Sequence, residues 1–283
     1  MLFDLQTKGF TVIPGVLTPS EITTAKKLFY EWVDQIPGIK DFHPNANPHG
    51  IFRYHQVGHQ PHAWFIRTRP GVQRPFQDYY QSKDLIVSYD GCSWFNQDFE
   101  NKHDSCWTHS DQAPKLTGFE CLQGFVSLTD NQHSSLVVYE GSHLLHSKYF
   151  QGNNSGQNWQ LIDPQFLKTI QDRKRVLQVS AGDLVLWDSR TFHQNQYGYP
   201  KCEERLVQYV CYFPRNHYKN TPEVQKQRKK YFQELRTTSH WPCPMRANSL
   251  QPSGNDNQNF RIDYTLLPKP QLNQYSSDIM KLI

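Results

Sequence analysis

Apolar residues recur at helical spacing in one stretch near the start of the chain. They are Ile22, Ala25, Phe29, Trp32 and Ile36. Residues three and four apart share a helix face, so these positions form one apolar stripe. The preceding run TPSE at residues 18–21 offers an N-cap, a proline for the first turn and a glutamate that closes a capping box, and Pro37-Gly38 follows the stripe. The pattern predicts a helix that ends before Pro37 and packs against the outside of a sheet.

From about residue 84 the pattern becomes that of strands. Seven short segments are rich in β-branched and aromatic residues and are separated by Gly, Asn, Asp or Ser. They are LIVSYDG, the stretch around Cys106 to His109, CLQGFVSLT, SLVVYEGSH, RVLQVSAGD, LVLWDS and RLVQYVCYF. This many short strands predicts a two-sheet sandwich or a barrel.

The segments around these strands carry weaker patterns. Residues 38–75 hold five of the 13 histidines, among Pro, Gly, Asn and Arg, and their spacing fits no compact zinc motif. These histidines are His43, His49, His55, His59 and His62. We expect residues 43–62 to form a polar, His-rich loop over the mouth of a site. Residues 150–163 read as a polar insertion.

The whole chain, 1–283, is expected to form one domain. It would have a helical N-terminal part with the His-rich loop over 1–80, a β core over 84–213, and a C-terminal part over 220–283. In that last part a basic helix begins near Thr221-Pro222-Glu223 and carries Lys226, Arg228, Lys229 and Lys230. Its charges suit a solvated face. The tail after Pro242 is expected to wrap the surface irregularly.

Composition narrows the class of protein. The net charge of +4, from 30 basic and 26 acidic residues, does not indicate a nucleic-acid partner. No segment approaches the roughly 20 apolar residues of a membrane span, and the N-terminal residues do not resemble a signal peptide. The six cysteines, Cys92, Cys106, Cys121, Cys202, Cys211 and Cys243, form no CxxC pair. We therefore expect a soluble, reduced, cytoplasmic protein, with its oligomeric state left open.

Three candidate metal ligands are far apart in the sequence. His109 and Asp111 lie two apart in a strand-like segment, where both side chains point to one face. His193 follows the apolar strand at 184–188, which would carry it to the mouth of a pocket. Two imidazoles and one carboxylate can bind one face of an Fe(II) ion and leave the other positions free. Taken alone, His109 and Asp111 fit a surface histidine beside an aspartate equally well, because His-x-Asp arises by chance in a His-rich chain.

Arg205 opens the apolar strand RLVQYVCYF. A cation that faces inward from a core strand is costly unless it meets an anion. The anion could be a co-substrate held by a bidentate ion pair, or an internal Asp or Glu. Trp107 and Trp187 flank the ligand segments, where they could pack in the core or line a substrate cavity.

Taken together, these segments resemble the phytanoyl-CoA dioxygenase family of Fe(II)/2-oxoglutarate-dependent oxygenases. The similar parts, between about residues 8 and 213, are GFTVIPGVLTPSEI, the run from His109 to Gln112, SLVVYEGSH, residues 181–193 and Arg205. One departure is Glu140, where the family usually has proline, away from the metal site. The resemblance implies a mainly β fold with flanking helices, a double-stranded β-helix (a jelly-roll, cupin-like barrel).

The resemblance also implies a site and a reaction. The iron ligands and catalytic centre would be His109, Asp111 and His193, and the residues around 2-oxoglutarate would be Arg205, Asn195 and Gln123. The reaction would use Fe(II), 2-oxoglutarate and O2 to hydroxylate a small organic metabolite, with release of succinate and CO2. Because iron halogenases of this fold have Gly or Ala at the aspartate position, Asp111 favours hydroxylation over halogenation.

Two other functions remain open from the sequence. One is a catalytically silent jelly-roll binding protein, and the other is a cupin-type metalloenzyme that does not use 2-oxoglutarate. In the second case Arg205 would be an ordinary ion-pair residue. The identity of the substrate has no readable code in the sequence.

Overall fold

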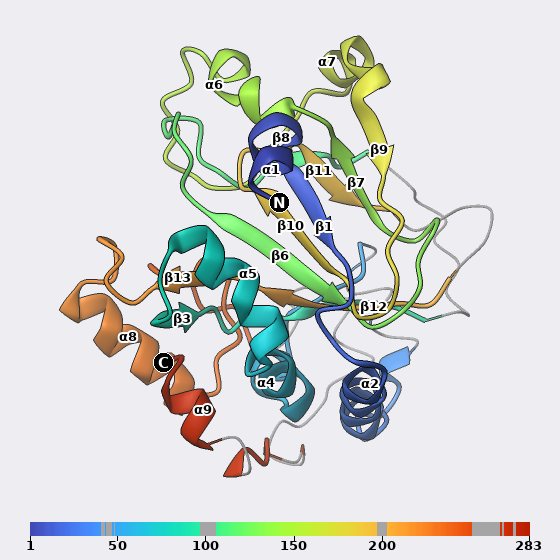
Figure 1. Cartoon of the computed structure of the whole chain (residues 1–283), viewed down its shortest axis with the longest axis vertical. Helices are drawn as coiled ribbons and strands as arrows, with labels where there is room; N and C mark the ends of the chain where they lie inside the picture. The colour runs from blue at the N-terminus through green and yellow to red at the C-terminus, as the bar shows by residue number, and fades with distance from the viewer. Residues whose placement is uncertain are drawn as a thin grey trace.

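Two antiparallel sheets form the centre of the protein (Figure 1). The computed structural model describes residues 1–40, 43, 47, 49–96, 106–196, 203–250, 267, 269–273 and 276–283. The six-stranded sheet has the order β1 (Phe10–Ile13), β10 (Leu184–Asp188), β6 (Leu122–Ser127), β12 (Arg205–Val210), β4 (Cys92–Phe95), β2 (Ile51–Phe52). The five-stranded sheet has the order β8 (Gln160–Leu161), β5 (His109–Ser110), β11 (His193–Asn195), β7 (Leu136–Tyr139), β9 (Lys174–Val176). A separate pair joins β13 (Tyr212–Pro214) to β3 (Leu85–Val87).

Helices flank the sheets, as predicted. They are α1 (Leu2–Lys8), α2 (Pro19–Val33), α4 (Pro61–Arg67), α5 (Pro70–Tyr80), α6 (His146–Tyr149), α7 (Pro164–Thr169), α8 (Pro222–Gln233) and α9 (Ser276–Met280). In Figure 1, α2, α4 and α5 lie on one side of the six-stranded sheet, and α6 and α7 lie at the opposite end of the molecule. The mainly β fold with flanking helices is therefore confirmed. Within the described ranges no ladder joins the two large sheets, so a closed barrel is not shown.

Alternation along the strands separates two cores. On β6, Leu122 and Val126 pack with the helices, whereas Phe125 belongs to a cluster with Leu136 and Val138 of β7 between the sheets. Strand side chains alternate between faces, so Gln123 shares the inner face with Phe125. The inner face of β6 therefore contributes Phe125 to the core between the sheets and the polar side chain of Gln123 to the same space.

The predicted N-terminal helix is confirmed as α2. Thr18 is its N-cap, and the side chains and backbones of Thr18 and Glu21 complete the capping box. The helix ends at Val33, earlier than the apolar stripe suggested, and Ile36 is buried in the turn that follows. Phe29 meets Trp94 of β4 edge-on, with ring centroids 5.4 Å apart, so α2 covers the outer face of the sheet as expected.

The interpretation of residues 43–62 as a polar loop is wrong for the part that the structure describes. His43, His55, His59 and His62 are at most 2% exposed, and they pack among aromatic rings next to α2 and α4. Burial lowers the pKa of His43 to about 4 and that of the other three to about 3. These imidazoles are therefore neutral members of the core. Residues 41–42, 44–46 and 48 lie outside the described residues.

These buried histidines predict that acid destabilises the fold. The pKa of His62 is about 3 in the folded protein against an ordinary value of 6.5, so between those pH values only the unfolded chain takes up the proton. The contribution of the neutral histidine to the free energy of unfolding is fully present above pH 6.5. It decreases as the pH falls, by about 2 kcal/mol for one such histidine at pH 5. Denaturant titrations between pH 7 and 5 should show a shallower loss of stability for His62→Leu. The same change at exposed His133 is the matched control for the loss of an imidazole, and equal slopes for both variants would contradict this account.

The C-terminal part is only partly as predicted. The basic helix is confirmed as α8, but Arg228 is fully buried and donates to the carbonyl oxygens of Pro242 (2.5 Å), Val87 (3.1 Å) and Leu282 (3.0 Å). It therefore fastens the tail to the body of the protein. Residues 251–266 of the predicted irregular tail lie outside the described residues.

Cys92, Cys106, Cys121, Cys211 and Cys243 are free thiols, and Cys202 lies outside the described residues. None of the described helices combines the length and apolar character that crossing a membrane requires.

Candidate active site

Two histidines face each other on neighbouring strands of the five-stranded sheet. His193 of β11 is the direct cross-strand partner of His109 of β5, and their ring centroids are 4.4 Å apart. Asp111 follows β5 and turns its carboxylate toward both rings, with Oδ1 3.6 Å from His109 Nε2 and Oδ2 3.3 Å from His193 Nε2. One donor atom from each of the three residues lies within 4.8 Å of the other two, and all three residues are buried. This donor set and its spacing suit a single metal ion.

Backbone carbonyls fix the tautomer of both rings. His109 Nδ1 lies 3.1 Å from the carbonyl oxygen of Trp107, and His193 Nδ1 lies 2.9 Å from that of Thr191. A carbonyl oxygen only accepts, so each Nδ1 carries the hydrogen and each Nε2 keeps a free lone pair. Metal-bound histidines are held by the same second hydrogen bond. Both rings therefore present the correct nitrogen to the space beside Asp111.

The charges of the three groups also suit a cation. Burial lowers the pKa of His109 to about 3, and the neighbouring His193 adds to this. Burial opposes ionisation of the Asp111 carboxyl, yet His240, His109 and His193 outweigh it and hold its pKa well below the ordinary value. Neutral His109 and ionised Asp111 are the protonation states that metal ligands need.

Gln123 reaches this centre from the other sheet. Its Nε2 on β6 donates to Asp111 Oδ2 at 3.0 Å. One carboxylate oxygen is therefore engaged, while Oδ1 makes no hydrogen bond within the described structure. The sequence placed Gln123 near a co-substrate, and the structure shows it in contact with a predicted ligand.

Arg205 lies at the start of β12, fully buried, with its guanidinium over the ring of Phe125. Its Nη1 donates to Ser93 Oγ at 2.5 Å, while Nε and Nη2 have no partner among the described residues. Burial lowers its pKa, and nearby Tyr209 lessens this effect. A buried guanidinium with these two remaining donors is suited to pair with an anion.

Asn195 of β11 lies at the wall of the cavity that contains the three candidate ligands. Its Nδ2 donates to the Tyr209 hydroxyl at 3.1 Å, and to the carbonyl oxygen of His49 at 3.2 Å. Asn195 and Tyr209 line the cavity, and Tyr209 is next to the buried Arg205. The structure thus brings together five of the six predicted site residues at the cavity wall, and the sixth, Arg205, is in contact with a residue of that wall.

The cavity has a volume of about 590 Å³. Trp107 and Trp187, for which the sequence left core and cavity roles open, both line it. Trp107 stacks on His109, with ring centroids 4.8 Å apart. Sequence reasoning missed several lining residues, which are Arg53, Asp90, Trp159, His240, Trp241 and Arg246.

The segments that carry these missed residues were interpreted differently from the sequence. Trp159 belongs to the insertion at 150–163, and Arg246 belongs to the tail after Pro242 that was expected to wrap the surface. His240 and Trp241 lie between the basic helix and that tail. No local motif marks them, because each reaches the cavity through tertiary packing alone.

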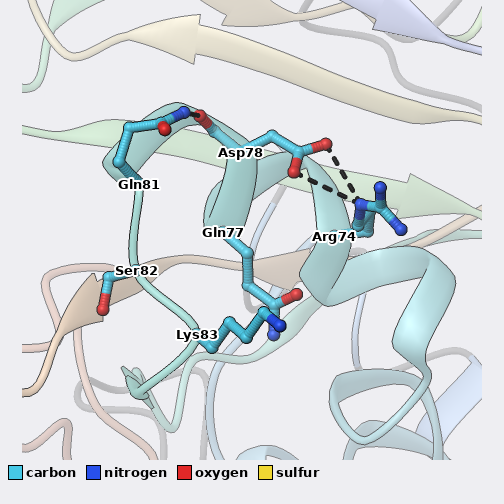
Figure 2. Close-up of a pocket in the computed structure, with 6 residues that line it drawn as sticks. All are labelled: Arg74, Gln77, Asp78, Gln81, Ser82 and Lys83. Atoms are coloured by element: carbon cyan, nitrogen blue, oxygen red, sulfur yellow. Dashed lines mark hydrogen bonds and ion pairs between the residues drawn. The ribbon is translucent and has the colours of Figure 1, made fainter.

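A second hollow, at the C-terminal end of α5, has a different character (Figure 2). It is lined by Arg74, Gln77, Asp78, Gln81, Ser82 and Lys83. Its one carboxylate, Asp78, is already paired with Arg74 Nε at 3.2 Å. This surface hollow lacks the donor set and the aromatic walls of the larger cavity.

The fold and the His-Asp-His donor set together define the class of Fe(II)- and 2-oxoglutarate-dependent oxygenases. Residues 5–196, more than half of the chain, match the family described as "Phytanoyl-CoA dioxygenase (PhyH)". The chain belongs to the phytanoyl-CoA dioxygenase family, and the resemblance seen in the sequence is confirmed.

Individual proteins are similar over parts of the chain. "Ava biosynthesis cluster protein O" of Aspergillus versicolor is 28% identical over 208 residues, which are 67% of this chain and 65% of that protein. The match therefore spans slightly less than two thirds of that relative's length. HygX of Streptomyces hygroscopicus, solved with nickel and 2-oxoglutarate bound, is 18% identical with a TM-score of 0.53, covering 75% of this chain and 85% of its own. The epimerase SnoN, solved with Fe3+, alpha ketoglutarate and nogalamycin RO, is 16% identical with a TM-score of 0.51, covering 75% and 81%. The two structures show the likeness of fold.

Proposed function

We propose that this protein is an Fe(II)- and 2-oxoglutarate-dependent dioxygenase that hydroxylates a small organic metabolite and releases succinate and CO2. The observation that carries the proposal is the buried set of His109, Asp111 and His193, whose donor atoms lie within 4.8 Å of one another. Both histidines are held in the tautomer that leaves Nε2 free. This set fits Fe(II), and it leaves positions on the cavity side for co-substrate and O2.

Each residue has a stated part in this proposal. His109, Asp111 and His193 hold the iron, and Gln123 keeps the Asp111 carboxylate in place. Arg205 pairs with the distal carboxylate of 2-oxoglutarate through its unpaired Nε and Nη2. Asn195, which bonds to Tyr209 beside Arg205, orients the same end of the co-substrate.

When bound, iron and 2-oxoglutarate supply the oxidation of the substrate at the expense of O2. The residues of the chain bind and orient both molecules, and the tryptophans of the wall keep water away from the reacting C–H bond. SnoN shows that an enzyme with this fold can also be an epimerase. Asp111 supports hydroxylation over halogenation, because it fills the place that a halide would need.

The two alternative functions are less well supported. A silent binding protein has no need of three complete ligands in the correct tautomers. A cupin-type enzyme without 2-oxoglutarate leaves the two buried donors of Arg205 without a function, since no carboxylate pairs with them in the described parts of the chain.

Anaerobic spectroscopy tests the proposal. Adding Fe(II) and 2-oxoglutarate should give the visible iron-to-keto-acid charge-transfer band, and admitting O2 should then yield succinate. Zn(II) is the matched control, because it can occupy the same ligands but gives no such band. Absence of both band and succinate in the wild-type protein would refute the enzyme function.

A further inference from the structure

One wall of the cavity lies beyond residues 5–196, the part that matches the family. Residues 239–241 and 246–248 all line the cavity. An antiparallel β-bridge between Thr238 and Ala247 joins the two segments. The iron and 2-oxoglutarate residues account for none of these positions. This wall is therefore available to recognise the molecule on which the site acts.

The wall is fastened to the body of the protein. Thr238 exchanges two hydrogen bonds with Tyr89, with Tyr89 N donating to Thr238 Oγ1 at 3.1 Å and Thr238 N donating to Tyr89 O at 2.9 Å. Gly58 N donates to Thr237 Oγ1 at 3.0 Å, and Arg236 Nη2 donates to Asn248 O at 2.7 Å. These bonds fix where the side chains of the wall point.

His240 extends from this wall toward the metal centre. Its Nε2 lies 4.0 Å from Asp111 Oδ2, which is too far for a hydrogen bond, and it has no hydrogen-bond partner among the described residues. It does not belong to the set of close donor atoms formed by the three predicted ligands. His240 thus presents an unpaired ring nitrogen beside the reacting centre.

Asp90 presents a carboxylate to the same cavity from the turn between β3 and β4. Gly91 N donates to its Oδ1 at 2.7 Å, and no cation pairs with it in the described structure. Buried Arg67 donates through Nη2 to the backbone oxygen of Asp90 at 2.5 Å and so holds the turn. A side chain at Gly91 would collide with the Phe52 carbonyl, which further restricts the turn. The Asp90 carboxylate is therefore held in place at the cavity, where it can accept a hydrogen bond from a ligand.

Tryptophan side chains also line the cavity. Four of the seven tryptophans line the cavity, which are Trp107, Trp159, Trp187 and Trp241. Trp159 is 44% exposed and lies 5.5 Å from the ring of His109. Trp107 already stacks on His49 and on His109, with ring centroids 4.0 and 4.8 Å apart, so the accessible aromatic face is that of Trp159. A flat apolar face of this kind binds rings.

We propose that the cavity binds a ring compound that carries a hydroxyl or amine group, with the ring against Trp159 and the polar group hydrogen-bonded to Asp90 and His240. This inference names the substrate class of the proposed oxygenase. Binding of the ring compound does not depend on the proposed function, whereas its oxidation after binding does. Asp90 and His240 are substrate-binding residues that determine specificity.

Three indoles of similar shape test the proposal. Tryptamine carries an amine, tryptophol carries a hydroxyl, and skatole carries neither, while the indole N–H is common to all three. Calorimetry on the protein loaded with Ni(II) and 2-oxoglutarate should show tryptamine or tryptophol binding at least tenfold more tightly than skatole. Preference for tryptamine identifies an amine, and preference for tryptophol identifies an alcohol. Equal affinities, or no binding of any of them, would overturn the proposal.

Variants connect the selectivity to the named residues. Asp90→Asn keeps the size of the side chain but removes its charge, and it should weaken tryptamine about tenfold with little change for skatole. His240→Phe keeps a ring but no hydrogen bond, and it should reduce the preference for tryptophol. Asp84→Asn and His133→Phe, the same changes at exposed positions outside the cavity, should leave the three affinities as in the wild type. Unchanged selectivity in both cavity variants would overturn the assignment.

The charge-transfer band separates this inference from the proposed function. If the band and succinate form but the indoles bind alike, the oxygenase function stands and the substrate class is wrong. If the indoles are distinguished but no band forms, the binding wall stands and the oxygenase function is wrong.

Discussion

Replacing His193 with alanine should abolish the charge-transfer band and lower succinate formation by at least about a hundredfold. His193 supplies one of three protein ligands, and the loss of even an outer-shell partner of a metal ligand costs about 10- to 100-fold. The remaining pair, His109 and Asp111, has no further donor from the described residues within the same close set. Anaerobic titration with Fe(II) in the presence of 2-oxoglutarate measures the effect.

Two controls accompany this variant. His133→Ala removes an exposed imidazole outside the cavity and should leave both readouts unchanged. Added imidazole should restore part of the band in His193→Ala, because the variant leaves a space the size of the missing ring beside Asp111. If His193→Ala kept the wild-type band, the ligand assignment would be wrong.

Replacing Arg205 with alanine should raise the dissociation constant of 2-oxoglutarate by about 10- to 100-fold, since hydrogen bonds to charged groups contribute about 1.5–3 kcal/mol. The guanidinium is fully buried, so no water-exposed cation can take its place easily. The band, titrated with 2-oxoglutarate at a fixed concentration of Fe(II), gives the constant directly.

The Arg205 variant needs a test of its folded state and its metal site. Ni(II) binding measured by calorimetry should stay close to wild type, because Arg205 does not touch the three metal donors. Arg215→Ala, which removes an arginine paired with Asp84 Oδ1 at 2.9 Å, is the matched control and should bind 2-oxoglutarate normally. Wild-type affinity for 2-oxoglutarate in Arg205→Ala would refute its role.

Local signals in the sequence predicted the elements whose faces differ in polarity. The capping box and apolar stripe of α2 are visible because one face of that helix meets the sheet and the other meets water. Strand β10, which precedes His193, and strand β12, which begins with Arg205, are visible as apolar runs with turn residues around them. These runs, with the family resemblance, were enough to place the donor set.

The parts that could not be predicted are those in which tertiary contacts decide. Six of the seven residues of α4 are buried, and the exception is Pro61. The helix therefore has no solvent-exposed face, and its sequence shows no helical period. The four buried histidines next to it look polar in the sequence, but they are neutral in the core. His240 and Asp90 are 150 positions apart in the sequence, and only the packing of residues 237–238 on Gly58 and Tyr89 brings both to one cavity.

The cross-strand pairing of His109 with His193 has a consequence for synthesis of the chain. Protein chains emerge from the ribosome N-terminus first, and 82 positions separate Asp111 from His193. The donor set cannot be complete until β11 has been made and has paired with β5. The wall around residues 238–248 arrives later still. A nascent chain therefore carries no complete donor set until His193 has been made, and the cavity gains the wall around residues 238–248 only after that.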